Sequence, residues 1–148
     1  MSRPIDPPTF EPTTKPRVLI EATEWAMRES MATVVRNAGY EVAACAGPEG
    51  TDQPCALIAD GICPAVENAD IVVHLLRHQD LRNRDVLRNL RRRHPNLPVV
   101  VQVPEPRVSA FPEDFAGCHL LPFPAGPGAL RETIDRALGS SSAAQDPT

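Results

Sequence analysis

Short apolar runs alternate with longer segments of helical periodicity along the middle of this chain. The runs have the length and the Val, Leu and Ile content of strands buried in a parallel sheet. We predict five such strands, at residues 17–21, 40–44, 69–76, 98–103 and 118–121. His74 interrupts the third strand, and we interpret it as a hydrogen-bonded core histidine rather than a ligand.

Three segments that follow the first, third and fifth of these runs repeat apolar residues with the 3.6-residue period of an α-helix. The first follows Thr23, a suitable N-cap, and ends at Gly39. The second covers about residues 81–94 and stops before Pro95, because proline cannot continue a helix. The third covers residues 127–138.

Prolines and glycines interrupt two connections where a regular alternation would place further helices. Residues 47–54 are rich in Gly, Pro and Asp, and residues 104–116 contain three prolines. We therefore expect the second and fourth helices to be shortened or irregular. Strands that alternate with helices predict an α/β domain in which helices cover both faces of a parallel sheet.

Both ends of the chain differ in composition from this core. Residues 1–15 are rich in proline, and residues 139–148 are mostly small or polar. Neither end carries enough apolar surface to offset the entropy lost on ordering, so we predict disordered tails at 1–15 and 139–148. One domain at 16–138 remains, which suits a chain of 148 residues.

Charge and hydropathy exclude several classes of function. A net charge of −4 argues against a general nucleic-acid or membrane-surface binder. The sequence has no run of about 18 apolar residues that would span a bilayer, and no apolar stretch typical of a secretory signal. We therefore expect a cytoplasmic location.

Three parts of the sequence resemble the receiver (CheY-like) domain of response regulators. The segment RVLIEATEWAMRESMATVVRNAGYEV at 17–42 is similar to the family's first strand, first helix and second strand. Residues 69–104, which include ADIVVHLL and LPVVVQVP, are similar to its third strand, third helix and fourth strand, and residues 120–138 to its closing turn and last helix. The resemblance implies a flavodoxin-like three-layer sandwich with five parallel strands in the order 2-1-3-4-5.

The five positions that carry phosphoryl chemistry in that family hold other residues here. The resemblance aligns the magnesium-binding acidic pair with Ala22 and Thr23, and the phosphate-accepting aspartate with Leu75. It aligns the family's Ser/Thr with Val103 and its lysine with Leu121. Ala, Leu and Val side chains provide neither a nucleophile nor oxygen ligands for Mg²⁺. The resemblance thus implies a degenerate phosphorylation pocket, in a pseudo-receiver that needs no cofactor.

A shift in this alignment is the alternative for the phosphate acceptor. A gap would bring Asp80 or Asp85 nearer to the pocket. Both residues lie beyond the end of the predicted strand, so we favour the ungapped alignment.

Cys45, Cys55 and Cys63 form a C-x9-C-x7-C series around the irregular second helix. Thiolates hold zinc or iron–sulfur clusters, but the C-x2-C pairs typical of such sites are missing. A Cys55–Cys63 redox pair would need Cα atoms within about 7 Å of each other. We favour small buried thiols, and a redox- or metal-responsive regulator is the alternative function.

Arginines crowd the third predicted helix and its approach. They are Arg77, Arg82, Arg84, Arg88, Arg91, Arg92 and Arg93. Such a helix face can meet an acidic protein surface or a phosphate backbone, with Arg84, Arg88, Arg91 and Arg92 as the candidate partner surface. A solvated face is the interpretation we favour, and the lack of interleaved aromatic residues makes DNA binding the weakest alternative.

Trp25 is the only tryptophan and lies beside the predicted degenerate pocket. An exposed indole there is a candidate anchor for a partner, because tryptophan is enriched at interface hot spots. Packing over the apolar pocket is the other interpretation, and the sequence leaves both open.

The leading hypothesis is a phosphorylation-independent interaction module in two-component signalling or transcriptional regulation, and not an enzyme. The expected partner is another protein or a second copy of this chain. The last helix and its neighbouring surface are a further candidate for the contact. We expect no membrane association and no cofactor, and nucleic acid is an unlikely ligand.

Overall fold

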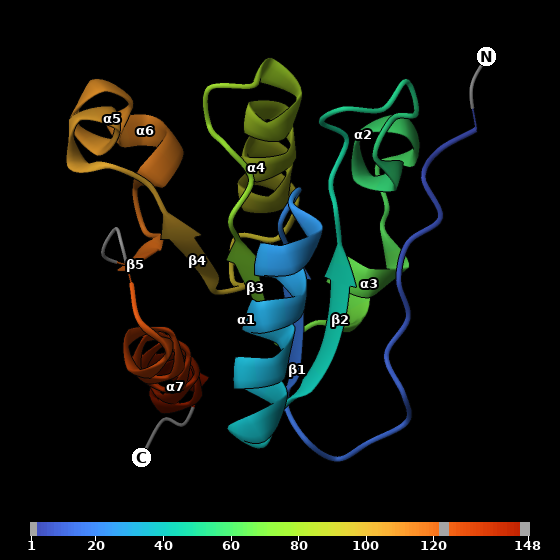
Figure 1. Cartoon of the computed structure of the whole chain (residues 1–148). Coiled ribbons are helices and arrows are strands. Elements are labelled where there is room, and N and C mark those ends of the chain that lie inside the picture. The colour runs from blue at the N-terminus through green and yellow to red at the C-terminus, as the bar shows by residue number, and fades with distance from the viewer. Residues whose placement is uncertain (1–2, 122–124, 146–148) are drawn as a thin grey trace.

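The computed structural model describes residues 3–121 and 125–145, with side chains as far as residue 139. Its centre is a sheet of five parallel strands in the order β2-β1-β3-β4-β5 (Figure 1). The strands are β1 (Arg17–Glu21), β2 (Glu41–Cys45), β3 (Ile71–His74), β4 (Val99–Gln102) and β5 (His119–Leu121). The predicted flavodoxin-like topology is therefore confirmed.

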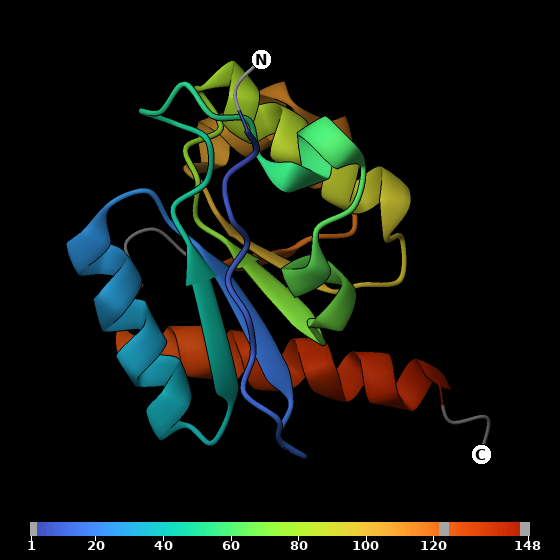
Figure 2. The same ribbon diagram turned by 90° about the vertical axis from the view of Figure 1, so that its right-hand side faces the viewer.

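Helices cover both faces of the sheet, as Figure 2 shows. One face carries α1 (Trp25–Asn37) and α7 (Pro127–Gln145), and the other carries α2 (Ala56–Asp60), α3 (Pro64–Asn68) and α4 (Leu81–Arg93). Two short helices, α5 (Glu105–Ala110) and α6 (Pro112–Phe115), connect β4 to β5. Among the described helices, none is long and apolar enough to cross a membrane.

The two faces of the sheet have separate hydrophobic cores. Val18 and Ile20 of β1 pack towards α1 and α7, where Leu130 and Ile134 are fully buried. Leu19, the residue between them, packs towards α2, α3 and α4. Successive strand side chains point to opposite faces, so an unbroken apolar run fits a strand that is covered on both sides.

The second and fourth helical connections are irregular, as expected. The second contains two five-residue helices, because α2 ends at Gly61 with φ +75° and α3 begins on Pro64. The fourth is broken between α5 and α6 at Phe111, which precedes Pro112. A residue before proline is driven away from helical geometry, so one continuous helix cannot form there.

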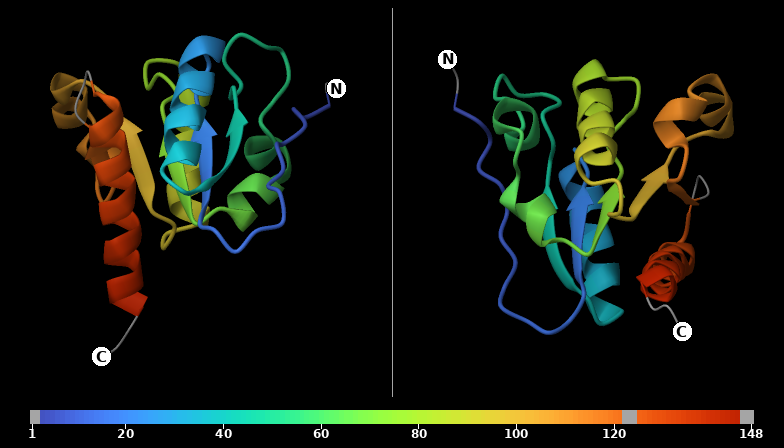
Figure 3. Two further views of the ribbon diagram at one scale, coloured as in Figure 1. Left: turned by 60° about the horizontal axis from the view of Figure 1, so that its bottom comes forward. Right: turned by 180° about the vertical axis from the view of Figure 1, so that it is seen from behind.

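The N-terminal segment makes contacts with the domain, and whether it is disordered in solution stays a prediction. Residues 3–16, which we call the strap, run in an extended path beside α2 and α3 and then turn into β1 (Figures 1 and 3). The Ile5 N–H donates to the Pro54 carbonyl at 2.9 Å, and Phe10 packs against the core on the α2–α4 face. Prolines lower the entropy of the unfolded chain, so these few contacts suffice to place the segment.

The C-terminal end differs from the expectation. Helix α7 continues to Gln145 rather than ending near Leu138. The added residues are serine, alanine, glycine and glutamine, and a helix that is already nucleated continues through such residues at low cost. Residues 146–148 of the expected tail lie outside the described part of the chain.

A polar cluster joins the loop after β3 to the α5–α6 connection. The His78 Nε2 atom lies 2.8 Å from Asp114 Oδ2, and Arg107 Nε donates to His78 Nδ1 at 2.8 Å. Since arginine can only donate, Nδ1 must be the acceptor and the proton must be on Nε2. His78 is therefore neutral, buried, and packed against the rings of Phe111 and Phe115.

Arginines of α4 complete this cluster, which we call the arginine clamp. Arg88 donates to both carboxylate oxygens of Asp114, at 2.9 and 3.2 Å. Arg84 donates to the His78 carbonyl and its guanidinium lies 4.7 Å from the centre of the Phe111 ring. Arg91 donates to the Ala116 carbonyl. These contacts hold α5 and α6 in place although neither helix is long enough to be stable alone.

Protonation of His78 should weaken the arginine clamp. Burial lowers the pKa of His78, with Arg84 and Arg107 adding to the effect against the opposing influence of Asp114. A histidine whose folded-state pKa lies below the ordinary value of about 6.5 binds its proton first in the unfolded chain. The stability it provides is therefore present above about pH 6.5 and is lost as the pH falls from there towards the lowered folded-state pKa.

We expect the free energy of unfolding to fall more steeply with acidification in the wild type than in a His78→Gln variant. Glutamine cannot titrate, yet it offers a donor to Asp114 and an acceptor to Arg107. The difference in slope should approach but not exceed about 1.4 kcal/mol per pH unit, and urea unfolding between about pH 7 and about pH 5 measures it. A His119→Gln variant is the matched control. Equal slopes in wild type and His78→Gln would contradict the assignment.

Candidate functional site

The carboxyl ends of the parallel strands meet at one edge of the sheet, where ligands bind in folds of this topology. Register brings Glu21, the last residue of β1, opposite both Cys45 of β2 and His74 of β3. Two of the five predicted pocket positions, Ala22 and Leu75, directly follow β1 and β3. The edge is therefore the place to test the predicted degenerate pocket.

Three of the five predicted positions come together in one hydrophobic cluster. Ala22 and Leu121 are buried, and the partly buried Leu75 packs against the same cluster between the sheet, α1 and α7. The Leu75 N–H donates to the Glu21 carbonyl at 2.8 Å, and the Ala22 N–H to the Cys45 carbonyl at 3.0 Å. Backbone hydrogen bonds between neighbouring strands thus extend to Ala22 and Leu75. The side chains of these two residues and of Leu121 pack as apolar groups in the predicted pocket.

The other two predicted positions, Val103 and Thr23, do not belong to this hydrophobic cluster. Val103 packs with Phe115 in a separate cluster beside β4, so the structure does not bring it to the other three. The hydroxyl of Thr23 is buried and has no hydrogen-bond partner in the described structure. Thr23 is also not the N-cap of α1, which is Glu24, because the helix begins one residue later than the sequence suggests.

Arg28 lies over the loop that follows β1, a feature that sequence reasoning missed. Its Nη1 atom donates to the carbonyls of Ala22 and Thr23, at 2.9 and 3.1 Å. A fixed positive charge therefore lies on the loop where the resemblance expects magnesium ligands. The sequence signal was an arginine one turn into the helix, but spacing alone does not tell whether such a side chain folds back or extends into solvent.

Glu21 and His74 form a buried polar pair on the opposite face of the sheet from this cluster. His74 Nδ1 lies 2.7 Å from Glu21 Oε1, and the two residues are 4% and 3% exposed. The interpretation of His74 as a hydrogen-bonded core histidine is confirmed, whereas its partner was missed. Enclosed by the core, the pair bonds β1 to β3 and has no access to a substrate.

The three cysteines of the predicted series lie around one small cavity. Cys45, Cys55 and Cys63 line a cavity of about 30 Å³ beneath the strap, about the volume of one water molecule. Burial raises the pKa of all three thiols, and the Glu21 carboxylate adds to the effect. They are free, and the described residues contain no group of three side chains able to hold a metal. Buried protonated thiols are poor nucleophiles, so the redox or metal alternative gains no support.

Three of the four arginines proposed as a partner surface are used inside the molecule. Arg84, Arg88 and Arg91 belong to the arginine clamp. Arg92 donates to the side chain of Asn89 at 2.7 Å on the same helix. Arg88 and Arg92 are nevertheless exposed to solvent, which agrees with the favoured solvated-face interpretation. The partner surface on these arginines stays a prediction.

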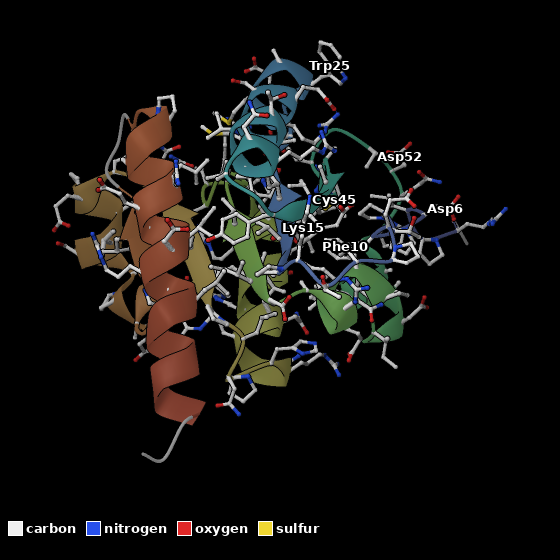
Figure 4. The ribbon with its side chains drawn as sticks, turned by 90° about the horizontal axis from the view of Figure 1, so that it is seen from below. Asp6, Phe10, Lys15, Trp25, Cys45 and Asp52 are labelled. Carbon is white, nitrogen blue, oxygen red and sulfur yellow. The ribbon has the colours of Figure 1, made fainter. Side chains whose placement is uncertain are left out.

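Trp25 is exposed at the first position of α1. Its residue exposure is 68%, and Figure 4 shows the side chain at the end of the helix, directed away from the ribbon. Leu81, at the first position of α4, is 67% exposed. Of the two interpretations of Trp25, packing over the pocket is not observed.

Known structures share this fold. A response regulator receiver (CheY-like) domain protein from Methanospirillum hungatei superposes with a TM-score of 0.67 at 19% identity, over 88% of this chain and 98% of that chain. A receiver domain protein from Clostridium thermocellum gives 0.66 at 18%, over 86% and 98%. NtrX from Brucella abortus gives 0.67 at 20%, over 89% of this chain and 28% of NtrX.

The structural similarity has no counterpart in the sequence comparisons. No family model matches the sequence, and no curated protein matches it. The structural likeness spans nearly the whole described chain, while fewer than about a quarter of the aligned residues are identical. The chain has the fold of a response-regulator receiver domain.

Proposed function

We propose that this chain is a pseudo-receiver that works without phosphorylation, as a protein–protein interaction module in signalling or transcriptional regulation. The observation that carries the proposal is the packing of Ala22, Leu75 and Leu121 into one hydrophobic cluster at the carboxyl edge. Phosphoryl transfer needs a nucleophilic oxygen and charge stabilisation at that place. Carbon side chains supply neither.

The electrostatics of the edge support the same conclusion. Mg²⁺ binds to several oxygen ligands, commonly carboxylates, and Thr23 would offer a single hydroxyl. The Arg28 guanidinium, held on the carbonyls of Ala22 and Thr23, would repel a divalent cation. Both features disfavour the bound metal that receiver phosphorylation requires.

Neither alternative aspartate is well placed to take over as the acceptor. The Asp80 carboxylate is the N-cap of α4 and accepts from the N–H groups of Arg82 and Asn83. Its pKa is lowered because these hydrogen bonds outweigh the effect of burial. Asp85 lies more than one turn into the same helix, beyond the end of β3.

The exposed indole supports a role in binding. Tryptophan is costly to leave in water, and an exposed apolar side chain at a helix end is a natural anchor for a partner pocket. Trp25 and Leu81 both mark helices that start at the carboxyl edge, the edge where the fold places its functional residues. We therefore place the partner contact at this edge, through Trp25, rather than on the arginines of α4. The cytoplasmic location and the homodimer alternative remain predictions.

Incubation with acetyl phosphate and Mg²⁺ should leave the mass of the protein unchanged. No side-chain oxygen at the end of β3 can attack the phosphoryl group, so intact-mass spectrometry should show no adduct. A receiver that retains its aspartate, treated in parallel, is the positive control. A stoichiometric adduct would refute the proposal, and Asp80→Asn and Asp85→Asn variants would then locate the acceptor.

Replacing Trp25 with alanine should abolish partner capture while leaving the fold intact. The indole is exposed, so we expect the free energy of unfolding to change by no more than about 0.5 kcal/mol. Loss of a hot-spot side chain weakens binding by about 2 kcal/mol or more, about thirtyfold. Affinity capture of the tagged chain from its own cells, followed by titration with the captured protein, measures the effect.

An Arg92→Ala variant is the matched control for this experiment, because it also truncates an exposed side chain near the start or end of a helix. Its captured set should equal that of the wild type. Sedimentation of the free protein tests the homodimer alternative at the same time. Identical capture by wild type and Trp25→Ala would exclude the carboxyl edge as the contact surface.

A further inference from the structure

A second cavity lies at the opposite end of the sheet, between the strap, α3 and the first residue of β1. Its volume is about 280 Å³, and we call it the strap cavity. It is lined by Pro8, Thr9, Phe10, Arg17, Pro64, Ala65 and Asn68. In Figure 4, the labels Asp6, Phe10 and Lys15 mark the strap that forms one of its walls. The proposed function does not involve this cavity.

The Arg17 side chain in this cavity is unpaired. Its Nε atom is buried without a hydrogen-bond partner, and its guanidinium forms no ion pair with any carboxylate of the described residues. Asp70 lies nearby, but its carboxylate accepts from the backbone N–H of Arg17 at 2.7 Å instead. A buried donor of a charged group that lacks a partner is costly, so an oxygen supplied from outside would stabilise it.

The remaining walls indicate what kind of molecule would supply that oxygen. Pro8, Phe10, Pro64 and Ala65 are apolar and suit a hydrocarbon body. The centre of the Phe10 ring lies 5.9 Å from the Arg17 guanidinium carbon, within the range of a cation–π contact. A charged head with an apolar body matches this combination.

The shape and lining of the cavity favour an organic carboxylate over inorganic phosphate. The planar guanidinium fork matches the two oxygens of a carboxylate. An organic acid also brings an apolar body to the Pro8, Phe10 and Ala65 walls, which phosphate lacks. At about 30 Å³ per water, the volume corresponds to roughly nine water-sized groups, which limits the ligand to a small molecule.

We propose that the strap cavity binds the carboxylate of a small apolar organic acid, with Arg17 as its anchor. The ligand contacts the strap on one side and α3 on the other, and so it fastens the strap to the body of the domain. Asn68 also lines the cavity, and its amide nitrogen donates to the Pro64 carbonyl at 2.8 Å. The site is independent of the carboxyl edge and of Trp25.

Benzoate is a suitable probe because it combines a carboxylate with a compact apolar ring. Titration of the full-length, isotope-labelled protein, followed by amide chemical shifts, should give saturable shifts at Phe10, Arg17 and Ala65. Benzamide, the neutral analogue, and inorganic phosphate should each bind at least about tenfold more weakly, because benzamide lacks the charge and phosphate lacks the apolar ring.

Two substitutions test the anchor. Arg17→Gln should weaken benzoate binding at least about tenfold, and Arg17→Lys, which keeps the charge but loses the fork, should weaken it by a smaller factor. Arg92→Gln is the matched control and should bind as the wild type does. If Arg17→Gln fails to fold, Arg17→Lys and the contrast between benzoate and benzamide decide the question.

The proposal is overturned by any of three results. These are shifts that do not saturate with benzoate in the wild type, equal binding of benzamide or tighter binding of phosphate, and unchanged affinity in both folded Arg17 variants. Because Trp25 and the carboxyl edge take no part, loss of this proposal would leave the proposed function untouched.

Discussion

The parallel pairing of β1 with β3 is the constraint on which the rest of this structure depends. Its register places Val18 opposite Ile71 and Glu21 opposite His74. This alignment sets which face of the sheet each side chain points to. A shift by one residue would move every apolar side chain of the strand to the other face. The buried bond between Glu21 and His74 exists in this register alone, so the pair stabilises the one alignment that also fills both cores.

The same register decides what meets at the carboxyl edge. Ala22 follows β1 and Leu75 follows β3, and their side chains enter the core shared with α1 and α7. At positions where the resemblance to receivers expects polar residues, Ala22 and Leu75 add to this hydrophobic core. Burial of these carbons contributes stability at roughly 25 cal/mol per Å² of apolar surface removed from water, which a solvated acidic pocket would not.

Several arginines of this protein stabilise irregular parts of the chain. The arginine clamp fastens α5 and α6, two helices that prolines keep short, through Asp114 and the neutral His78. Arg28 satisfies loop carbonyls at the end of β1 in the same way. Each arginine donates to several acceptors at once because its guanidinium is planar and carries five N–H groups. The buried Nε of Arg17 has no partner among the described residues, and this distinguishes the strap cavity from an ordinary crevice.

The alternation of apolar runs and helix-period segments in the sequence was enough to predict the five strands and the two irregular connections. Those features follow from local periodicity and from proline and glycine, which act on their immediate neighbours. The order of the strands was implied only by the resemblance to receiver domains. The sequence also predicted which residues lie at the carboxyl edge, because the predicted strand positions define where each strand ends.

Contacts between distant residues were decided only by the tertiary structure. No local rule links Glu21 to His74, Arg88 to Asp114 or Phe10 to the core beyond α3, since each pair is separated by tens of residues and joined by the fold. The arginines of α4 therefore resembled a surface patch, and the proline-rich N-terminus resembled a disordered tail. Sequence determined which segments could form strands and helices because that depends on neighbours; which charges are paired, and which remain open to a ligand, depends on what the folded chain brings within about 3 Å of them.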